Sequence, residues 1–180
     1  MSYEGELLNR SPNLDFRLTS AVVVSGASWN PCGHMLLCAG SSSANSWYFH
    51  VAGQGVAECM GFYAYPKFMR EAGYSRYLRE NQKCEIRRVD VRISNPRAAY
   101  QKLVDLMQAR WLWRVQQHNC ATFVQEIVAA GGGNLRVFLN CPDQEVVRGL
   151  DLYPPGWSAG PPPPPTQDSL VRRGPGTRYY

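Results

Sequence analysis

Three short apolar segments in the first third of the chain limit the folds that it can adopt. They are residues 19–26 (TSAVVVSG), 34–39 (HMLLCA) and 47–53 (WYFHVAG), and small or turn-forming residues bound each of them. Only the short polar loop 40–46 separates the second segment from the third. Strands joined by so short a loop run in opposite directions, so we predict that these two segments form an antiparallel hairpin.

Strand and helix patterns alternate in the rest of the chain. Residues 84–93 (CEIRRVDVRI) alternate apolar and charged side chains, which indicates a half-exposed strand. Pro96 then opens an amphipathic helix that ends near Arg110. In the aromatic segment 55–83 we predict one short helix, near residues 68–78. The chain is therefore expected to fold as an α+β domain with an antiparallel sheet.

A second helix places a cysteine in its first turn. From Cys120 onward the apolar residues have the spacing of one helical stripe, and the glycines 131–133 end the helix. Asn119 is the predicted N-cap. A thiol in this turn lies near unpaired backbone N–H groups and the positive end of the helix dipole, and both favour the nucleophilic thiolate. The alternative is that Cys120 is a small buried hydrophobic residue.

Two of the three histidines are predicted to approach each other. His34 begins one strand of the hairpin and His50 lies toward the end of its antiparallel neighbour, so both fall at the same edge. A thiolate attacks a carbonyl best when one imidazole holds the proton and a third polar group fixes the tautomer of that imidazole. The alternative is that both are hydrogen-bonded core histidines. His118 could line a cleft, contribute to an oxyanion site or cap the helix.

The other five cysteines form no comparable pattern. They are Cys32, Cys38, Cys59, Cys84 and Cys141. Cys32 is a rival nucleophile, but it lies in a Pro-Cys-Gly turn that no helix follows. Cys32, His34 and Cys38 have no fourth ligand nearby and the chain has no CxxC pair, so we predict neither a metal nor a cofactor. Disulfides are allowed outside the cytosol, with a connectivity that the sequence leaves open.

The order of the three candidate residues resembles that of a known family. The histidine of GHMLL comes first, the histidine of YFHV second, and NCATFV opens a helix much later. This order is similar to the circularly permuted branch of the NlpC-type papain-like cysteine hydrolases, which includes lecithin retinol acyltransferase. The resemblance covers about residues 19–139. It implies a permuted papain-like fold, in which the antiparallel sheet packs against the nucleophile helix.

The resemblance also implies a role for each residue. Cys120 would be the nucleophile, His34 the general base and acid, and His50 the polar residue that orients His34. The backbone N–H of Cys120 would contribute to an oxyanion hole. We place His118 and Asn119 in the substrate-binding or oxyanion region beside it.

Thiol-based hydrolysis of an amide is the predicted function, and the resemblance implies peptidoglycan peptides as the substrate. We expect a bacterial antagonistic toxin, for example a type VI secretion effector. Its further partners would be an immunity protein that occludes the cleft and a secretion-apparatus or adaptor protein. The alternatives are lipid acyl transfer or ester hydrolysis, deamidation or proteolysis of a host protein, and a non-catalytic module that acts through the Pro-rich tail.

The charge and the apolar content of the chain bear on its export and on its binding partners. The net charge of +5 is scattered along the chain, so no nucleic-acid partner is predicted. The polar arm 1–18 lacks the apolar centre of a signal peptide, and no apolar run is long enough for stable membrane insertion. We expect synthesis in the cytoplasm and export by a dedicated system. Residues 19–152 would form the hydrolase domain and residues 153–180 a disordered Pro-rich tail.

Overall fold

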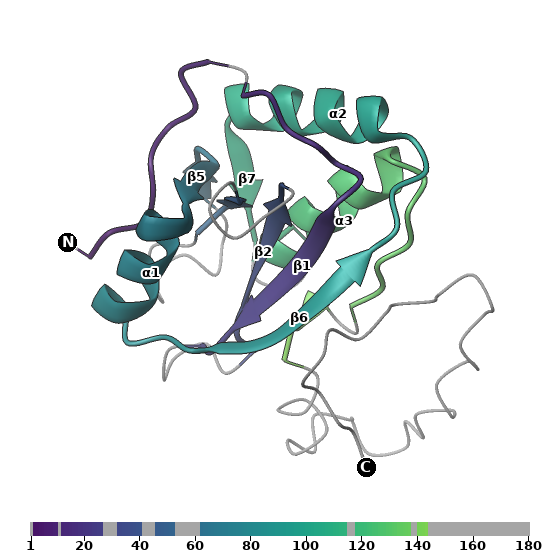
Figure 1. The fold of residues 1–180 in the computed structure, drawn as a ribbon. Helices are drawn as coiled ribbons and strands as arrows, with labels where there is room; N and C mark the ends of the chain where they lie inside the picture. The colour runs from purple at the N-terminus through teal and green to yellow at the C-terminus, as the bar shows by residue number, and fades with distance from the viewer. Residues whose placement is uncertain are drawn as a thin grey trace, which may run out of the picture.

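A five-stranded antiparallel sheet organises the part of the chain that the structure describes (Figure 1). In this computed structural model that part comprises residues 2–10, 12–26, 32–40, 46–52, 62–114, 118–137 and 140–143. The strands lie in the order β5-β3-β2-β1-β6, and each pair of neighbours is antiparallel. The predicted α+β class and the antiparallel sheet are confirmed.

The strands of this sheet are β1 (Thr19–Val24), β2 (His34–Ala39), β3 (Trp47–His50), β5 (Lys67–Arg70) and β6 (Glu85–Val91). A separate two-stranded sheet pairs β4 (Phe62–Ala64) with β7 (Trp111–Trp113). The helices of the described residues are α1 (Glu71–Glu80), α2 (Pro96–Gln108) and α3 (Cys120–Ala130). None of these helices is long and apolar enough to span a membrane.

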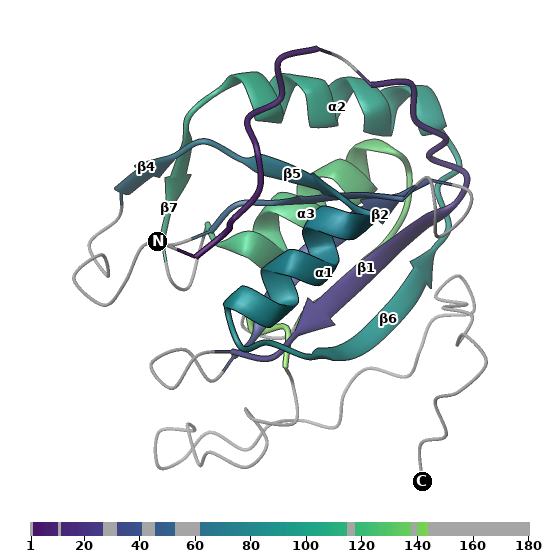
Figure 2. The ribbon, with the colours of Figure 1, turned by 60° about the vertical axis from the view of Figure 1, so that its left-hand side comes forward.

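Helices cover both faces of the larger sheet. α1 packs on one face, and α3 packs on the other with α2 beside it (Figures 1 and 2). All six residues of the central strand β2 are buried. Met35, Leu37 and Ala39 pack with α2 and α3, whereas Leu36 and Cys38 pack with α1. Burial on both faces explains why this strand lacks the polar alternation of a half-exposed one.

The predicted hairpin is present. β2 pairs with β3 from Ala39↔Trp47 to Leu37↔Phe49. The pairing stops at Leu37, so among the described strands the beginning of β2 has no partner on its β3 side. His34 and His50 lie at this end of the hairpin.

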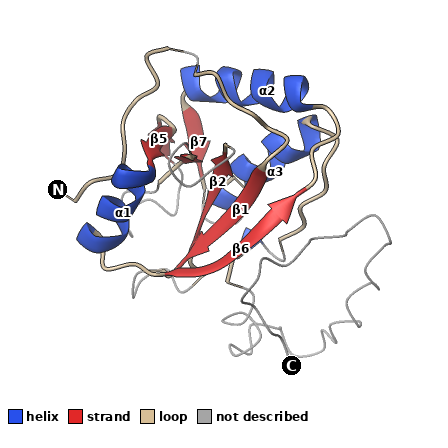
Figure 3. Ribbon diagram, viewed as in Figure 1, coloured by secondary structure: helices blue, strands red, loops and turns tan. Residues whose placement is uncertain are grey.

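The structure differs from the prediction in two segments. Within 55–83, the predicted short helix is present as α1, but the strands β4 and β5 before it were not predicted, and residues 53–61 lie outside the described part (Figure 3). The WLW strand β7 was not predicted, because it is only three residues long and its partner β4 is distant in the sequence. The predicted tail, 153–180, also lies outside the described residues.

The N-terminal arm packs against the domain. Glu6 and Phe68 of β5 exchange two backbone hydrogen bonds of 2.9 Å, which extends the sheet at this edge. Farther along, Phe16 is 1% exposed and its ring meets Tyr100 of α2 edge-on, with centroids 6.3 Å apart. The arm thus runs from α1 across to α2 (Figure 1).

A disulfide links Cys32, before β2, to Cys141, after α3. The N–H of Asp143 also donates to the carbonyl of Cys32 at 2.8 Å, so a backbone hydrogen bond joins the two segments in addition to the disulfide. The pairing removes Cys32 as a rival nucleophile. The free cysteines of the described residues are Cys38, Cys84 and Cys120.

Removal of this disulfide should destabilise the fold. Residues 32 and 141 are 109 positions apart, and cross-linking a loop of about that length stabilises a protein by about 4 to 5 kcal/mol in the chain-entropy account. We expect urea denaturation of the double variant Cys32→Ser/Cys141→Ser to show a free energy of unfolding lowered by up to that amount. Cys84→Ser, at an exposed free thiol, is the matched control. Equal stability of the double variant and the control would contradict the pairing.

Candidate functional site

The first turn of α3 carries Cys120, as the sequence predicts. The side-chain Oδ1 of Asn119 accepts hydrogen bonds from the N–H groups of Ala121 at 3.0 Å and Thr122 at 3.3 Å. The hydroxyl of Thr122 accepts in return from the N–H of Asn119 at 3.4 Å, which completes a capping box. The predicted N-cap is confirmed, and it fixes where the helix begins.

The sulfur of Cys120 is buried against the sheet. The residue is 4% exposed, and its Sγ accepts a hydrogen bond of 3.5 Å from the backbone N–H of Met35. Met35 follows His34 in β2 and lies beyond the last residue pair with β3. The start of α3 therefore contacts β2 just beyond the end of its pairing with β3.

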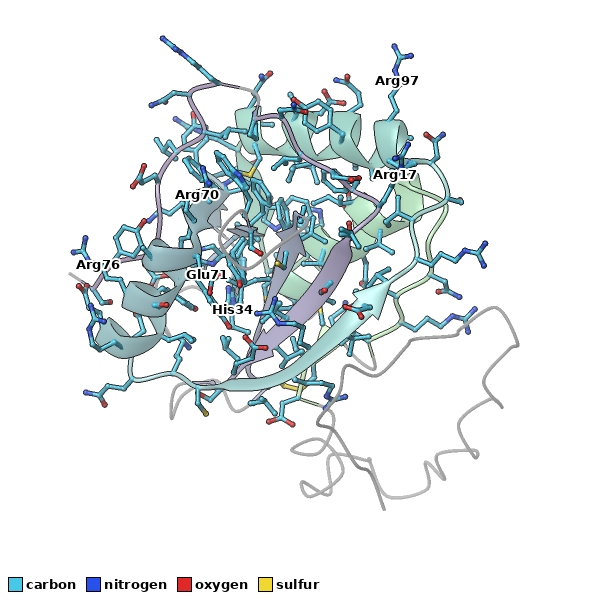
Figure 4. The ribbon with its side chains drawn as sticks, viewed as in Figure 1. Arg17, His34, Arg70, Glu71, Arg76 and Arg97 are labelled. Carbon is cyan, nitrogen blue, oxygen red and sulfur yellow. A yellow bond between two sulfur atoms is a disulfide. The ribbon has the colours of Figure 1, made fainter. Side chains whose placement is uncertain are left out.

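His34 and His50 are hydrogen-bonded to each other, which confirms their predicted approach. Nε2 of His34 lies 2.8 Å from Nδ1 of His50, and the rings are nearly perpendicular, at 84°. His50 is fully buried and His34 is 8% exposed. Both rings contact the ring of Tyr77 in α1, so they lie on the α1 side of the sheet. Figure 4 shows His34 between α1 and the strands.

A third hydrogen bond assigns the tautomers of both rings. Nε2 of His50 lies 2.9 Å from the backbone carbonyl oxygen of Glu4. A carbonyl oxygen only accepts, so Nε2 of His50 carries the proton, and Nδ1 of the neutral ring is an acceptor. His34 must then donate from Nε2 to that acceptor. Nδ1 of a neutral His34 is left unprotonated and is the basic nitrogen of the pair.

Burial keeps both imidazoles neutral. It lowers the pKa of His50 to about 4, although the backbone hydrogen bond to Glu4 opposes this shift. Burial also holds the pKa of His34 well below its ordinary value, and the neighbouring His50 and the positive charge of Lys83 lower it further. At neutral pH the pair is therefore uncharged, and His34 is able to accept a proton.

The thiol of Cys120 does not have the low pKa that we expected at a helix N-terminus. Burial raises its pKa to about 11, although the backbone N–H groups of Met35, Ala121 and Cys120 itself oppose the shift. The expectation weighed those N–H groups and the helix dipole, but not the loss of hydration. The resting sulfur is therefore a neutral thiol, and the predicted thiolate is wrong for this state.

The sulfur of Cys120 contacts the backbone of Met35, the residue after His34, but these two described residues, Cys120 and His34, share no side-chain hydrogen bond. The sulfur comes from the α3 side of the sheet, whereas both rings lie on the α1 side. Tyr77 lies close to both groups: its ring contacts the two histidines, and its pKa is raised by burial first, then by Glu4 and by Cys120 in its ionised form. Thiol and imidazoles are thus within electrostatic reach of one buried tyrosine.

The side chains of His118 and Asn119 are engaged within the fold. The ring of His118 stacks on Trp111 with centroids 3.7 Å apart, and its Nδ1 hydrogen-bonds to the carbonyl of Leu112. Besides capping α3, Asn119 donates from Nδ2 to the carbonyl of Asn140 at 2.9 Å. These contacts hold β7 and the segment after α3 in place, and a substrate-binding or oxyanion role for either residue stays a prediction.

Sequence reasoning missed three groups around the histidines: the Glu4 carbonyl, Tyr77 and Lys83. Lys83 donates from Nζ to the carbonyl of Ser25 at 3.1 Å, and its partial burial lowers its pKa. The three groups come from the N-terminal arm, α1 and the loop before β6. No local pattern marks any of them, because only the tertiary fold brings these segments together.

Comparison with protein-family models, with curated proteins and with solved structures finds no significant match to this chain. Among the described residues, no group of three or more His, Cys, Asp and Glu side chains is placed to hold a metal ion. The functional proposal therefore depends on the geometry of the site itself.

Alkylation rates should separate the free thiols of the native protein. Exposed Cys84 should react first with iodoacetamide. Cys120 should react slowly at pH 7, because its thiol is buried and neutral, and its rate should rise with pH toward its pKa of about 11. Peptide mass spectrometry after labelling between pH 7 and 10 measures each rate. Fast, selective labelling of Cys120 at pH 7 would show that the resting sulfur is a thiolate after all.

Two substitutions of Asn119 should separate the contribution of its helix cap to stability from that of its hydrogen bond to Asn140. Asn119→Asp keeps the oxygen that caps α3 and loses the Nδ2 donor to Asn140, whereas Asn119→Ala loses both. A cap and a neutral hydrogen bond each contribute about 1 kcal/mol. In urea denaturation we expect Asn119→Ala to cost about 2 kcal/mol and Asn119→Asp about half as much. Equal losses for the two variants would mean that the cap contributes nothing.

Proposed function

We propose that this protein is a cysteine-dependent amide hydrolase. Cys120 is the nucleophile, His34 the general base and acid, and His50 the partner that orients His34. The observation that carries the proposal is the 2.8 Å hydrogen bond between the two buried, neutral histidines at the end of β2 where α3 presents its cysteine. A base, an orienting group and a helix-borne nucleophile are the components that thiol catalysis requires.

The neutral resting state implies that proton transfer accompanies attack. The sulfur turns from the Met35 amide toward His34, and its proton passes to Nδ1 of His34 as the carbon–sulfur bond forms. The hydrogen bond from Nε2 of His34 to His50 stabilises the resulting imidazolium. Collapse of the tetrahedral intermediate then returns the proton to the leaving amine, and water hydrolyses the thioester by the reverse sequence.

The start of α3 is also suited to stabilise a negatively charged oxygen. The side chain of Asn119 occupies the N–H groups of Ala121 and Thr122. The N–H of Cys120 is not one of the donors to this cap, and it is one of the backbone groups that lower the pKa of the thiol. A backbone donor of this kind is typically worth about 3 kcal/mol in the transition state.

We further propose a permuted papain-like architecture of the NlpC type. The histidine strands β2 and β3 precede the cysteine helix α3 in the chain, and α3 packs on the same sheet. The glycine before His34, in the segment GHMLL, supports the resemblance to this family. Gly33 has a φ of +72°, and a Cβ there would lie 2.8 Å from the carbonyl oxygen of Val24, so a larger residue would displace the start of β2.

Peptidoglycan peptides are the proposed substrate, and the proposed role is that of an exported bacterial toxin with a cognate immunity protein. The Cys32–Cys141 disulfide supports a place of action outside the reducing cytosol. Lipid esters and amides of a host protein would pass through the same acyl-enzyme, so they are included in the test as competing substrates.

Incubation with purified sacculi should release new peptides, whereas phospholipid vesicles should remain intact. Cys120→Ala and His34→Ala should each slow peptide release by at least about 1,000-fold, since nucleophile and base act as a unit. His50→Ala should retain more activity, because His50 acts through His34. Chromatography coupled to mass spectrometry measures the products.

Cys38→Ser and Cys84→Ser are the matched controls, because both remove a free thiol away from the histidines and should keep normal rates. Release of lipid products instead of peptides would show that the proposed substrate is wrong, but it would leave the proposed catalytic residues unchanged. Normal peptide release by Cys120→Ala would refute the cysteine mechanism.

A further inference from the structure

The N-terminal residues 2–3 are anchored to the end of α1. The hydroxyl of Ser2 donates to Oδ1 of Asn81 at 2.8 Å, and Nδ2 of Asn81 donates to the carbonyl of Tyr3 at 2.9 Å. The N–H of Tyr3 donates to the carboxylate of Glu80 at 2.8 Å, and Arg76 lies 4.5 Å from the centre of the Tyr3 ring. Backbone and side chains of these two residues are therefore both fixed.

Three residues after Tyr3, the chain is anchored to β5. Glu6 exchanges its two backbone hydrogen bonds with Phe68. Gly5, beside it, has a φ of +94°, and a Cβ at this position would lie 2.7 Å from the carbonyl oxygen of Phe68 and 3.0 Å from Cγ of Met69. Any side chain at position 5 would thus push this stretch of backbone away from β5.

Glu4 lies between these two anchors and directs its carbonyl oxygen at Nε2 of His50, 2.9 Å away. His50 is completely buried, so this N–H has no access to solvent as a substitute acceptor. A buried imidazole N–H left without an acceptor destabilises the folded state, because it loses its hydration without a replacement. If the carbonyl is lost, the ring gains by rotating or by changing tautomer. Rotation breaks the hydrogen bond to His34, whereas a tautomer change makes Nδ1 of His50 a donor, so the hydrogen bond survives only in the reverse direction, with the proton of His34 moved to its Nδ1. Either change removes the arrangement in which Nδ1 of His34 is the basic nitrogen and His50 accepts from Nε2.

We infer that residues 2–6 are a positioning element of the site, in which the backbone carbonyl of Glu4 fixes the tautomer and orientation of His50. The element acts through His50 on His34 and touches neither substrate nor sulfur. Its effect on turnover rests on the proposed function, whereas its effect on the tautomer does not. The site then extends over four separate parts of the chain: the arm, β2, β3 and the start of α3.

The test is to displace the Glu4 carbonyl without touching either histidine. Gly5→Ala introduces the Cβ that meets Phe68. The double variant Tyr3→Ala/Asn81→Ala instead releases the other anchor without adding an atom. Leu7→Ala is the matched control, because Leu7 is 52% exposed and lies just beyond the element.

Long-range proton–nitrogen NMR of the histidine rings reports the tautomers directly. The unmodified chain and Leu7→Ala should show His50 protonated at Nε2 alone, and both arm variants should show a mixture with the Nδ1-protonated form. Activity on sacculi should fall by at least about tenfold in kcat, with little change in KM, since orientation of the base acts on the chemical step.

The two readouts keep the outcomes distinct. An unchanged His50 tautomer in either folded arm variant would overturn the inference, whatever the activity. A mixed tautomer in a protein whose unmodified form does not hydrolyse sacculi or vesicles would support the positioning role of the arm and refute the hydrolase. If Gly5→Ala does not fold, the Tyr3→Ala/Asn81→Ala variant decides the question by the same measurement.

Discussion

The hydrogen bond between the imidazoles of His34 and His50 is the interaction on which the site depends. It forms because β2 and β3 are antiparallel in a register that directs both rings to the α1 side of the sheet. A slip of one residue in β3 would turn His50 to the opposite face. Because the pair is buried, its remaining N–H also needs an acceptor, and the carbonyl of Glu4 supplies it. The register of the hairpin and the docking of the arm are thus parts of one arrangement.

Burial and backbone polarity compete at Cys120, and burial is the larger effect. Three backbone N–H groups favour the thiolate, yet the loss of hydration raises the pKa to about 11. The same loss of hydration keeps His34 and His50 uncharged. The thiol and both imidazoles are therefore neutral at rest, and in the proposed mechanism they become charged only when a substrate is attacked. This differs from cysteine sites whose low thiol pKa provides a thiolate before the substrate binds.

The sequence predicts those features that local patterns determine. The apolar strands, the short hairpin loop, the cap at Asn119 and the cysteine in the first turn of α3 all follow from residues close together in the chain. The approach of His34 and His50 follows as well, because one hairpin contains both. The arm contact of Glu4, the β4–β7 pairing and the disulfide could not be predicted, since each joins distant segments. The pKa of Cys120 was predicted in the wrong direction because burial is a tertiary property.

Trapping the acyl-enzyme tests the central claim most directly. Rapid acid quenching of the protein during its reaction with sacculi, followed by peptide mass spectrometry, identifies any residue that carries a substrate fragment. The account predicts a thioester adduct on the peptide that contains Cys120, and the loss of this adduct in His34→Ala. Turnover that proceeds with an adduct on another residue, or with Cys120 unmodified throughout, would contradict it.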